Sequence, residues 1–569
     1  MRVNRGDAVS RDEGRDATET TSGMPGDGMR TRIRIAAVVF LLAFLVVIGR
    51  LVMFGLMPAS DVTAYVDPNA AVASSRPDLI DRNGEILATD IKMASLYAEP
   101  RNILDPDEAT ELITSVLTDL DAPSLRNRLS TNAGFAWVQR EITPAQQEQI
   151  HSLGIPGIGF LTENRRFYPG GPTAAHIVGL VNVDNQGIAG FEKYVDDHGL
   201  ADLHAAGFAR GGDVEPVRLS IDLRVQHILR DELVGAMERY QAIAASGIVI
   251  NVHTGEVLAM VSLPDFDPNN PEDALQPDRL NRISAGAYEL GSVFKSFTFA
   301  MALDSGAVTM ADKIDAVSAI RVGRFTINDY HSKHRVLTVP EVFIYSSNVG
   351  AARMALKVGA ERQQEYLRRF GLLTKTETDL PEVARPIVPA KWSDLTAMTV
   401  AFGHGLAVTP LQSVVADAAL VNGGFLIPPT FQPRTTAEAE RLAVRVVSPE
   451  TSAQMRYLFR LNVEKGSGKR AEVPGYAVGG KTGTAEKVEN GRYSANKRLN
   501  SFLAAFPMDD PQYAVLIVLD EPKAEKQGGG TTAASNAAPT VGAVIRRAAA
   551  LLGVQPRNDT EMSTLLVSN

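Results

Sequence analysis

The sequence predicts an α+β protein: a single N-terminal transmembrane helix, then a mixed α and β region, then a larger domain of antiparallel sheet flanked by helices. The first observation is an apolar run of 23 residues, Ile35–Met57, interrupted by Arg50. The second is a set of hairpin signals between apolar runs, such as Asn83-Gly84 and His253-Thr-Gly255. The third is a series of late apolar runs that suggest antiparallel strands, at 476–487, 501–506 and 513–519.

The apolar run is long enough to anchor the chain in a membrane. A helix needs about 20 residues to cross the hydrocarbon core, and Ile35–Met57 supplies 23. Arg30, Arg32 and Arg34 precede the run, so the positive-inside rule places the N-terminus in the cytoplasm and the rest of the chain outside. A cleaved signal peptide fits less well, because the leader is long and the nearest Ala-x-Ala site begins only at Ala71.

These patterns divide the chain into five parts. The residues before the anchor are rich in charged and small polar types, and we expect them to be disordered. Glycines at Gly211 and Gly212 mark a boundary between the mixed region and the larger domain. The expected parts are a cytoplasmic tail at 1–34, an anchor at 35–57, a non-catalytic pedestal at 58–215, the larger domain at 216–554 and a C-terminal tail at 555–569.

Composition excludes several classes of function. The net charge is -9, which provides no basic surface for nucleic acid. The chain has no cysteine, so it can form neither disulfides nor thiolate metal sites. The pair His331 and His334 has no evident third ligand in the sequence. We therefore expect no metal, no other cofactor and no nucleic-acid partner.

The stretch Tyr288–Phe297, YELGSVFKSF, places a lysine in an apolar segment three residues after a serine. Gly291 breaks the chain, and Ser292 can begin a helix that is apolar around most of its circumference. Positions i and i+3 share a helix face, so Ser292 and Lys295 should be neighbours. Burial disfavours the ammonium, so Lys295 could act as a neutral base that activates Ser292. The helix N-terminus could also stabilise an alkoxide or oxyanion there.

Two further motifs follow this one along the chain. Ser346-Ser-Asn348 lies between helical stretches, and Lys481-Thr-Gly483 falls on an expected strand. A Ser-x-x-Lys motif alone is not specific, since a second copy, Ser494–Lys497, lies in the polar segment 489–500, which we interpret as a loop. The order of the three motifs and the apolar setting of Ser292 distinguish the first copy from the second.

In this order, the motifs resemble the signature of penicillin-binding proteins and class A β-lactamases. The resemblance to class B penicillin-binding proteins covers roughly residues 70–545 and is carried by RPDLIDRNGEILA, RRFYPGGPTAAHIVG, GIAGFEKYVD, LSIDLRVQ, FGHGLAVTPLQ and GYAVGGKTGTAEK. The YE-x-GS context of the serine and the overall length are more similar to the septal, FtsI-type cell-division transpeptidase than to the elongation enzyme. Leu290 stands where this family often has proline.

The resemblance implies a serine-type D-Ala-D-Ala transpeptidase with the penicillin-binding domain at 216–554. Ser292 would attack the carbonyl between the last two D-alanines of a peptidoglycan stem pentapeptide, and D-alanine would leave. An amine of a neighbouring stem peptide would then resolve the acyl-enzyme into a cross-link. Lys295 would take the serine proton, Ser346 would relay a proton to the leaving amine, and Asn348 would hold the substrate amide and the lysine. Lys481 would supply positive potential.

The strand that carries Lys-Thr-Gly is expected to bind the substrate. Thr482 and Thr484 are two residues apart, so on a strand they share a face and can hold the terminal carboxylate. Gly483 has no side chain, so the substrate backbone can approach and add as an extra strand. By resemblance, the backbone N–H groups of Ser292 and Thr484 would form the oxyanion hole, and penicillin would acylate the same serine.

The resemblance also implies partners and a location. We expect stem pentapeptides as donor and acceptor, β-lactams as covalent inhibitors, and one helix in the cell inner membrane with the catalytic domain in the periplasm at the division septum. A polytopic glycosyltransferase and other division proteins are expected partners, since no region of the chain resembles a glycosyltransferase. Three alternatives remain open: an elongation-type transpeptidase, a D,D-carboxypeptidase or β-lactamase that hydrolyses the acyl-enzyme, and a catalytically silent scaffold or sensor.

Overall fold

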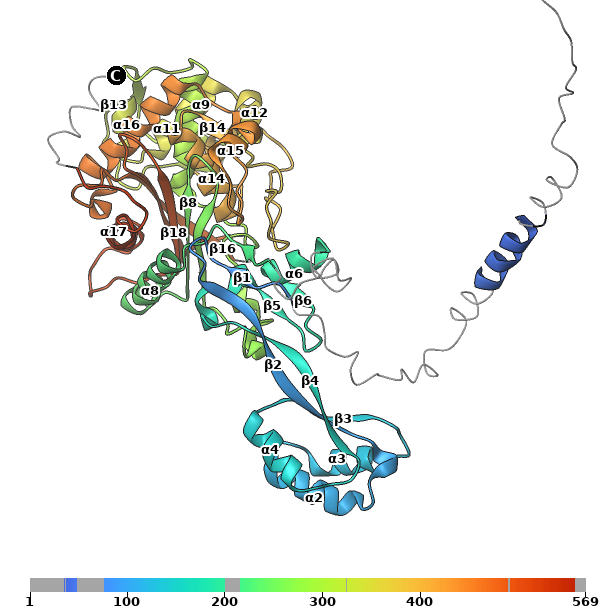
Figure 1. The fold of residues 1–569 in the computed structure, drawn as a ribbon. Helices are drawn as coiled ribbons and strands as arrows, with labels where there is room; N and C mark the ends of the chain where they lie inside the picture. Colours follow the sequence, from blue (N-terminus) through green and yellow to red (C-terminus); the bar gives the residue numbers. More distant parts are fainter. Residues whose placement is uncertain are drawn as a thin grey trace, which may run out of the picture. The chain divides into compact units, whose positions relative to one another are not determined.

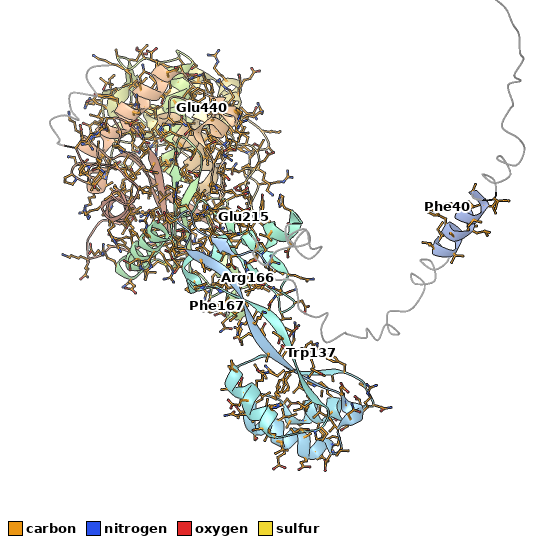
Figure 2. All side chains as sticks on the ribbon, viewed as in Figure 1. Phe40, Trp137, Arg166, Phe167, Glu215 and Glu440 are labelled. Carbon is orange, nitrogen blue, oxygen red and sulfur yellow. The ribbon has the colours of Figure 1, made fainter. Side chains whose placement is uncertain are left out.

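The computed structural model describes residues 35, 37–48, 76–199, 215–323, 325–489 and 492–557. The chain divides into two compact units, Met1–Ala70 and Ala71–Asn569. In the first, Ile35 and residues 37–48 are helical, and their apolar side chains are exposed, Phe40 among them (Figure 2). No helix of the described ranges is both long and apolar enough to cross a membrane. The rest of the expected anchor, the tail at 1–34 and residues 558–569 lie outside the described residues.

The mixed region is built on a sheet in which the long strand β2 is central (Figure 1). Strand β2 pairs antiparallel with β4 from Thr89↔Phe167 to Ala98↔Ile158, and it also pairs with β3 and β1. The predicted turn at Asn83-Gly84 joins β1 to β2, with Gly84 at φ +97°, a conformation that glycine adopts without steric cost. The strands are β1 (Leu79–Ile80), β2 (Ile86–Ala98), β3 (Ala136–Ile142), β4 (Ile158–Phe167), β5 (Leu180–Val181), β6 (Gly187–Ala189) and β7 (Val217–Arg218).

Helices cover one end of this sheet and form a small core with it. Asp105, Asp121 and Thr143 cap the N-termini of α2, α3 and α4 by accepting backbone N–H groups, and each helix has proline in its first turn. The buried faces of these helices pack with Leu96 and Val138 of the strands. The helices of this region are α2 (Pro106–Val116), α3 (Ala122–Leu129), α4 (Pro144–Ser152), α5 (Ala175–Val178) and α6 (Gly190–Asp197).

The other end of the β2–β4 ribbon carries a buried network of ionised side chains. Arg166, on β4 (Figure 2), lies 2.6 Å from Glu192 and 3.1 Å from Asp90, and its side chain is 1% exposed. Arg76 lies 3.0 Å from the same Glu192 and 2.7 Å from Asp196. Both arginines also donate to backbone carbonyls. Because buried charges are costly unless they are paired, each partner here depends on the others.

The larger domain is a five-stranded antiparallel sheet in the order β16-β17-β18-β8-β9. Side chains of β18 alternate between two cores. Leu516 and Val518 face the core formed with α9, α11, α14 and α16, whereas Val515 and Ile517 face the core formed with α8 and α17. The α+β class with an antiparallel sheet is therefore confirmed. The main strands are β8 (Ala244–Asn251), β9 (Val257–Leu263), β16 (Gly479–Glu489), β17 (Arg492–Phe506) and β18 (Tyr513–Asp520).

Helices cover both faces of this sheet, with α8 and α17 together on one side (Figure 1). The central helix of the larger domain, α9, is buried at every position from Lys295 to Leu303. The helices are α8 (Leu223–Tyr240), α9 (Lys295–Asp304), α10 (Val339–Ile344), α11 (Asn348–Val358), α12 (Ala360–Arg369), α13 (Asp394–Val400), α14 (Pro410–Val421), α15 (Thr436–Leu442), α16 (Pro449–Lys465) and α17 (Ala537–Ala548). Short strands complete the domain: β10 (Lys313–Asp315), β11 (Ile320–Val322), β12 (Phe325–Ile327), β13 (Val336–Thr338), β14 (Phe425–Leu426) and β15 (Val444–Arg445).

One local expectation is wrong. The polar segment 489–500 was expected to be a loop, but Arg492–Phe506 is a strand, and Val488↔Tyr493 and Glu489↔Arg492 pair across the hairpin. The polar composition indicated solvent exposure. A loop and a hairpin at the edge of a sheet are both exposed, so composition alone did not distinguish a loop from a strand here. Strand β16 is thus the edge strand of the sheet and extends well beyond Thr484.

Candidate active site

The predicted nucleophile lies on a tight turn that leads into the buried helix. Gly291–Phe294 forms a 3-10 turn, and the α-helix proper begins at Lys295. Gly291 has φ +59°, a conformation that side chains rarely adopt. The turn brings Nζ of Lys295 to 2.9 Å from Oγ of Ser292. The predicted neighbourhood of serine and lysine is therefore present, although the serine sits in the 3-10 turn rather than in the α-helix.

The amine of Lys295 is surrounded by oxygen atoms from a second segment. Its Nζ lies 2.7 Å from Oδ1 of Asn348, 2.5 Å from the backbone carbonyl of Ser346 and 3.0 Å from Oγ of Ser346. Two of these acceptors are carbonyl oxygens, which can only accept hydrogen bonds. The lysine side chain itself is buried. The first and second motifs therefore meet at one amine.

The Ser-Ser-Asn segment forms the turn between α10 and α11, and its shape is specific. Ser346 has φ +53°, an uncommon conformation for a residue with a side chain and one that concentrates at functional sites. Ser347 caps α11 by accepting from the N–H of Gly350, and it donates to Asp329 at 2.7 Å. Asp329 also accepts from the N–H of Val349. The Asp329 carboxylate therefore holds the turn through Ser347 and Val349. Oγ of Ser346 is left pointing toward Lys295 and Lys481.

The third motif completes the cluster from strand β16. Nζ of Lys481 lies 2.9 Å from Oγ of Ser346, and it also donates to the carbonyl of Thr482 at 3.2 Å. Lys481 is fully buried. Oγ of Ser346 thus lies between the amines of Lys295 and Lys481. All five expected catalytic side chains are joined by contacts of 3.0 Å or less.

Burial strongly perturbs both lysines. The pKa of Lys295 is held well below its usual value by burial and further by the nearby charge of Lys481, against the opposing effect of Asp329. Burial lowers the pKa of Lys481 from 10.5 to about 7. Neither amine has a carboxylate in direct contact among the described residues. Burial therefore shifts the amine beside the hydroxyl of Ser292 toward its neutral form.

Strand β16 packs directly on the nucleophile turn, and only glycine allows this. A Cβ atom at Gly483 would lie 2.3 Å from the carbonyl oxygen of Leu290 and 2.4 Å from Oγ of Ser501. A Cβ atom at Gly291 would lie 2.9 Å from the carbonyl oxygen of Thr484. The backbone of the turn at Gly291 is therefore in contact with the backbone of β16 at Gly483 and Thr484. The two segments can lie this close because neither glycine has a side chain.

The hydroxyl groups of the two expected carboxylate-binding threonines have different partners. Oγ1 of Thr482 lies 2.7 Å from Oγ of Ser467. Oγ1 of Thr484 accepts from the N–H of Ala533 at 3.1 Å, which leaves its own proton free to donate. Ser467 and Asp329 could not be identified from the sequence, because each contacts the motifs only in the folded chain. Neither lies in a recognisable spacing with its partners.

The remaining candidates do not join this cluster. Ser494 and Lys497, the second Ser-x-x-Lys pair, lie on β17. His331 and His334 are exposed, and within the described ranges no group of three or more His, Asp or Glu side chains is arranged to hold a metal ion.

Comparison with known proteins identifies the family of the chain. The family described as "Penicillin binding protein transpeptidase domain" matches residues 245–542. The chain belongs to this family. A second family, "Penicillin-binding Protein dimerisation domain", matches residues 71–198. The class B fold, with a dimerisation region followed by a transpeptidase domain, is therefore confirmed.

Relatives with named activities match most of the chain. It is 42% identical over 507 residues to a probable peptidoglycan D,D-transpeptidase FtsI of Caulobacter vibrioides, covering 87% of this chain and 84% of the relative. It is 30% identical to the peptidoglycan D,D-transpeptidase FtsI of Escherichia coli K12, covering 85% of each. The crystal structure of penicillin-binding protein 3 from Mycobacterium tuberculosis in complex with aztreonam matches with a TM-score of 0.65 and 25% identity, covering 85% of this chain and 98% of that one. The expected serine-type peptidoglycan D,D-transpeptidase of FtsI type is confirmed.

Proposed function

We propose that Ser292 is the nucleophile of this transpeptidase and that neutral Lys295 is its base. A neutral amine has two N–H groups and one lone pair. The carbonyl oxygens of Ser346 and Asn348 accept the two N–H groups at 2.5 and 2.7 Å. The lone pair is then left for the hydroxyl proton of Ser292 at 2.9 Å. This arrangement of two carbonyl acceptors around the amine is the observation that supports the proposal most strongly.

The acylation step follows from this geometry. Ser292 attacks the carbonyl between the last two D-alanines and transfers its proton to Lys295. Oγ of Ser346, 3.0 Å from that amine, relays a proton to the leaving nitrogen, and D-alanine departs. An amine of a second stem peptide then attacks the ester, its proton returns through Lys295 to Ser292, and the cross-link is complete. Asn348 orients both the substrate amide and the base.

Substrate binding is assigned to the edge strand. Among the described strands β16 pairs with β17 alone, so a stem peptide can add at its other edge through backbone hydrogen bonds, and we assign Gly483 to the strand segment that receives it. We assign the terminal carboxylate to the hydroxyls of Thr482 and Thr484, with Lys481 supplying positive potential. The N–H groups of Ser292 and Thr484 are proposed as the oxyanion hole. A β-lactam would occupy the same positions.

The setting of the enzyme is also a proposal. We propose that residues 35–57 anchor the chain in the inner membrane, with 58–215 as pedestal and 216–554 as periplasmic transpeptidase domain. The 23-residue apolar run and its preceding arginines support this. The two FtsI relatives support a role at the division septum. We propose that a polytopic glycosyltransferase supplies the glycan strands there. Depletion should then give filamentous cells, whereas rounded cells would indicate an elongation enzyme.

The test is mass spectrometry of the intact protein after reaction with penicillin, followed by mapping of the modified peptide. We expect one adduct, on Ser292, that is absent from Ser292→Ala. Ser494→Ala, in the second Ser-x-x-Lys motif, is the matched control and should react normally. An adduct that persists in Ser292→Ala would refute the assignment of the nucleophile. An adduct that hydrolyses within seconds would instead favour a hydrolase.

A further inference from the structure

Glu289 lies three residues before the nucleophile and connects three separate segments. Its Oε1 accepts from the backbone N–H of Gly405 at 2.8 Å. The hydroxyl of Tyr493 donates to its Oε2 at 3.1 Å and lies 3.3 Å from Oε1. Gly405 belongs to the loop after α13, and Tyr493 belongs to the first residues of β17. One carboxylate therefore joins the nucleophile turn, this loop and the outer end of the β16–β17 hairpin.

The loop Phe402–Gly405 is packed tightly against the nucleophile turn. A Cβ atom at Gly403 would lie 2.0 Å from the carbonyl oxygen of Gly291. The ring centroid of His404 lies 5.3 Å from that of Tyr493 and 5.2 Å from that of Phe402. The three rings thus form a continuous row from the loop to the hairpin. Such aromatic contacts add to the hydrogen bonds in holding the two segments together.

The carboxylate of Glu289 is half-buried and makes no ion pair with a described lysine or arginine. Burial raises its pKa, against the hydrogen bonds from Gly405 and Tyr493. A half-buried carboxylate without a cation is costly to a fold. The hydrogen bonds from Gly405 and Tyr493 partly offset that cost.

The hairpin that Glu289 holds is the one that binds substrate. Tyr493 pairs with Val488 on β16, four residues beyond Thr484 on the same strand. On its other side the hairpin is tied to the sheet by Lys487, which donates to Asp520 and Glu521 at 2.8 Å each. Glu289 is thus the described side chain that ties the outer hairpin to the turn carrying Ser292.

We propose that Glu289 is a positioning residue: its carboxylate clasps the Phe402–Gly405 loop and the outer β16–β17 hairpin onto the nucleophile turn, and so sets the distance between Ser292 and the substrate-binding strand. This rests on the proposed role of Ser292 as the acylated residue. Small displacements of a reacting group lower rates steeply, by about a hundredfold for 1 Å. The clasp should consequently act on the acylation step rather than on the initial binding of a ligand.

The experiment measures fluorescent-penicillin acylation of the full-length protein by stopped flow, separating the noncovalent dissociation constant from the first-order acylation rate constant. Glu289→Leu removes both hydrogen bonds, and we expect its acylation rate constant to fall at least tenfold, with little change in the dissociation constant. Glu289→Gln keeps an acceptor oxygen and should retain most of the rate. Tyr493→Phe, which leaves the carboxylate in place, should give an intermediate loss.

A double-mutant comparison separates the clasp from a general effect on folding. The Glu289→Leu/Tyr493→Phe double variant should be no slower than Glu289→Leu, because the two groups share one contact. Tyr366→Phe is the matched control: it also loses a tyrosine–carboxylate hydrogen bond, to Asp304, and should acylate at the normal rate.

Several results would overturn the clasp. A wild-type rate in Glu289→Leu would do so, as would a Glu289→Gln variant as slow as the leucine variant, which would assign the effect to charge. Fully additive losses in the double variant would also contradict it. If Glu289→Leu fails to fold, Tyr493→Phe alone decides, and a normal rate there refutes the proposal. Mapping the adduct in each variant keeps the two claims apart, since modification away from Ser292 refutes the proposed nucleophile and not the clasp.

Discussion

The buried amine of Lys481 should make the folded protein less stable than a variant without it. Its pKa falls from 10.5 to about 7 on burial. Between these values the unfolded chain binds a proton that the folded domain releases, so the free energy of unfolding must rise with pH across this window. Lys481→Met removes the titrating group while keeping nearly the same length of side chain. We therefore expect the variant to lose both the penalty and its pH dependence.

The size of the effect follows from the pKa. A tenfold change in a protonation equilibrium is worth about 1.4 kcal/mol, so the buried amine destabilises the fold by about 4 kcal/mol at pH 7 and by about 2 kcal/mol at pH 9. The hydrogen bonds from Lys481 to Ser346 and Thr482 offset about 2 kcal/mol. Lys481→Met should thus gain about 2 kcal/mol at pH 7 and almost nothing at pH 9, while losing most of its acylation rate.

Urea unfolding at pH 7 and pH 9 measures this directly. The chain has two tryptophans, Trp137 in the pedestal and Trp392 in the larger domain. A Trp137→Phe background leaves Trp392 fluorescence to report on the larger domain alone. Lys487→Met, on the same strand, is the control: there hydrogen bonds to Asp520 and Glu521 outweigh burial and raise the pKa, so its loss should destabilise by about 1 kcal/mol. Parallel pH slopes for wild type and Lys481→Met would refute the reasoning.

Two further variants test the packing that positions the site. Gly483→Ala would place a Cβ atom 2.3 Å from the carbonyl oxygen of Leu290, so the rate of penicillin acylation should fall at least a hundredfold. The control is Gly235→Ala in α8, which has open space around it and should react normally. A normal rate in Gly483→Ala would contradict the close approach of β16 to the turn. Arg166→Met removes one of the two buried arginines that pair with Glu192 and a partner of Asp90. It should lower the free energy of unfolding, followed by Trp137 fluorescence, by at least about 2 kcal/mol. Arg126→Met, which breaks an exposed pair with Asp107, should change it by less than about 1 kcal/mol.

Much of the site was predictable because its chemistry is local. The pairing of Ser292 with Lys295 follows from helical spacing, and the edge strand with Lys481 follows from its alternation and glycines. The convergence of the three motifs could not be derived from spacing, since they lie far apart in sequence; the family resemblance supplied it. Asp329 was missed for the same reason, because a carboxylate that holds a turn from behind has no signature of its own.

The fold was predictable to a similar depth. A tight turn such as Asn83-Gly84 depends on neighbouring residues and was identified correctly. The start of β17 at Arg492 was not, because its polar side chains on an edge hairpin carry the same composition as a loop. The order of strands in the sheet, and the two cores that β18 separates, depend on contacts between distant segments.

The pH dependence of penicillin acylation tests most directly whether neutral Lys295 activates Ser292. The second-order rate constant should be measured from pH 5 to pH 10, with Lys295→Met as the inactive reference. If the lysine is neutral in the folded protein, the rate reaches its maximum near neutral pH, and it declines above that as Lys481 loses its charge. A rate that keeps rising tenfold per pH unit through pH 9 would mean that the base is an ordinary lysine, and it would contradict the mechanism.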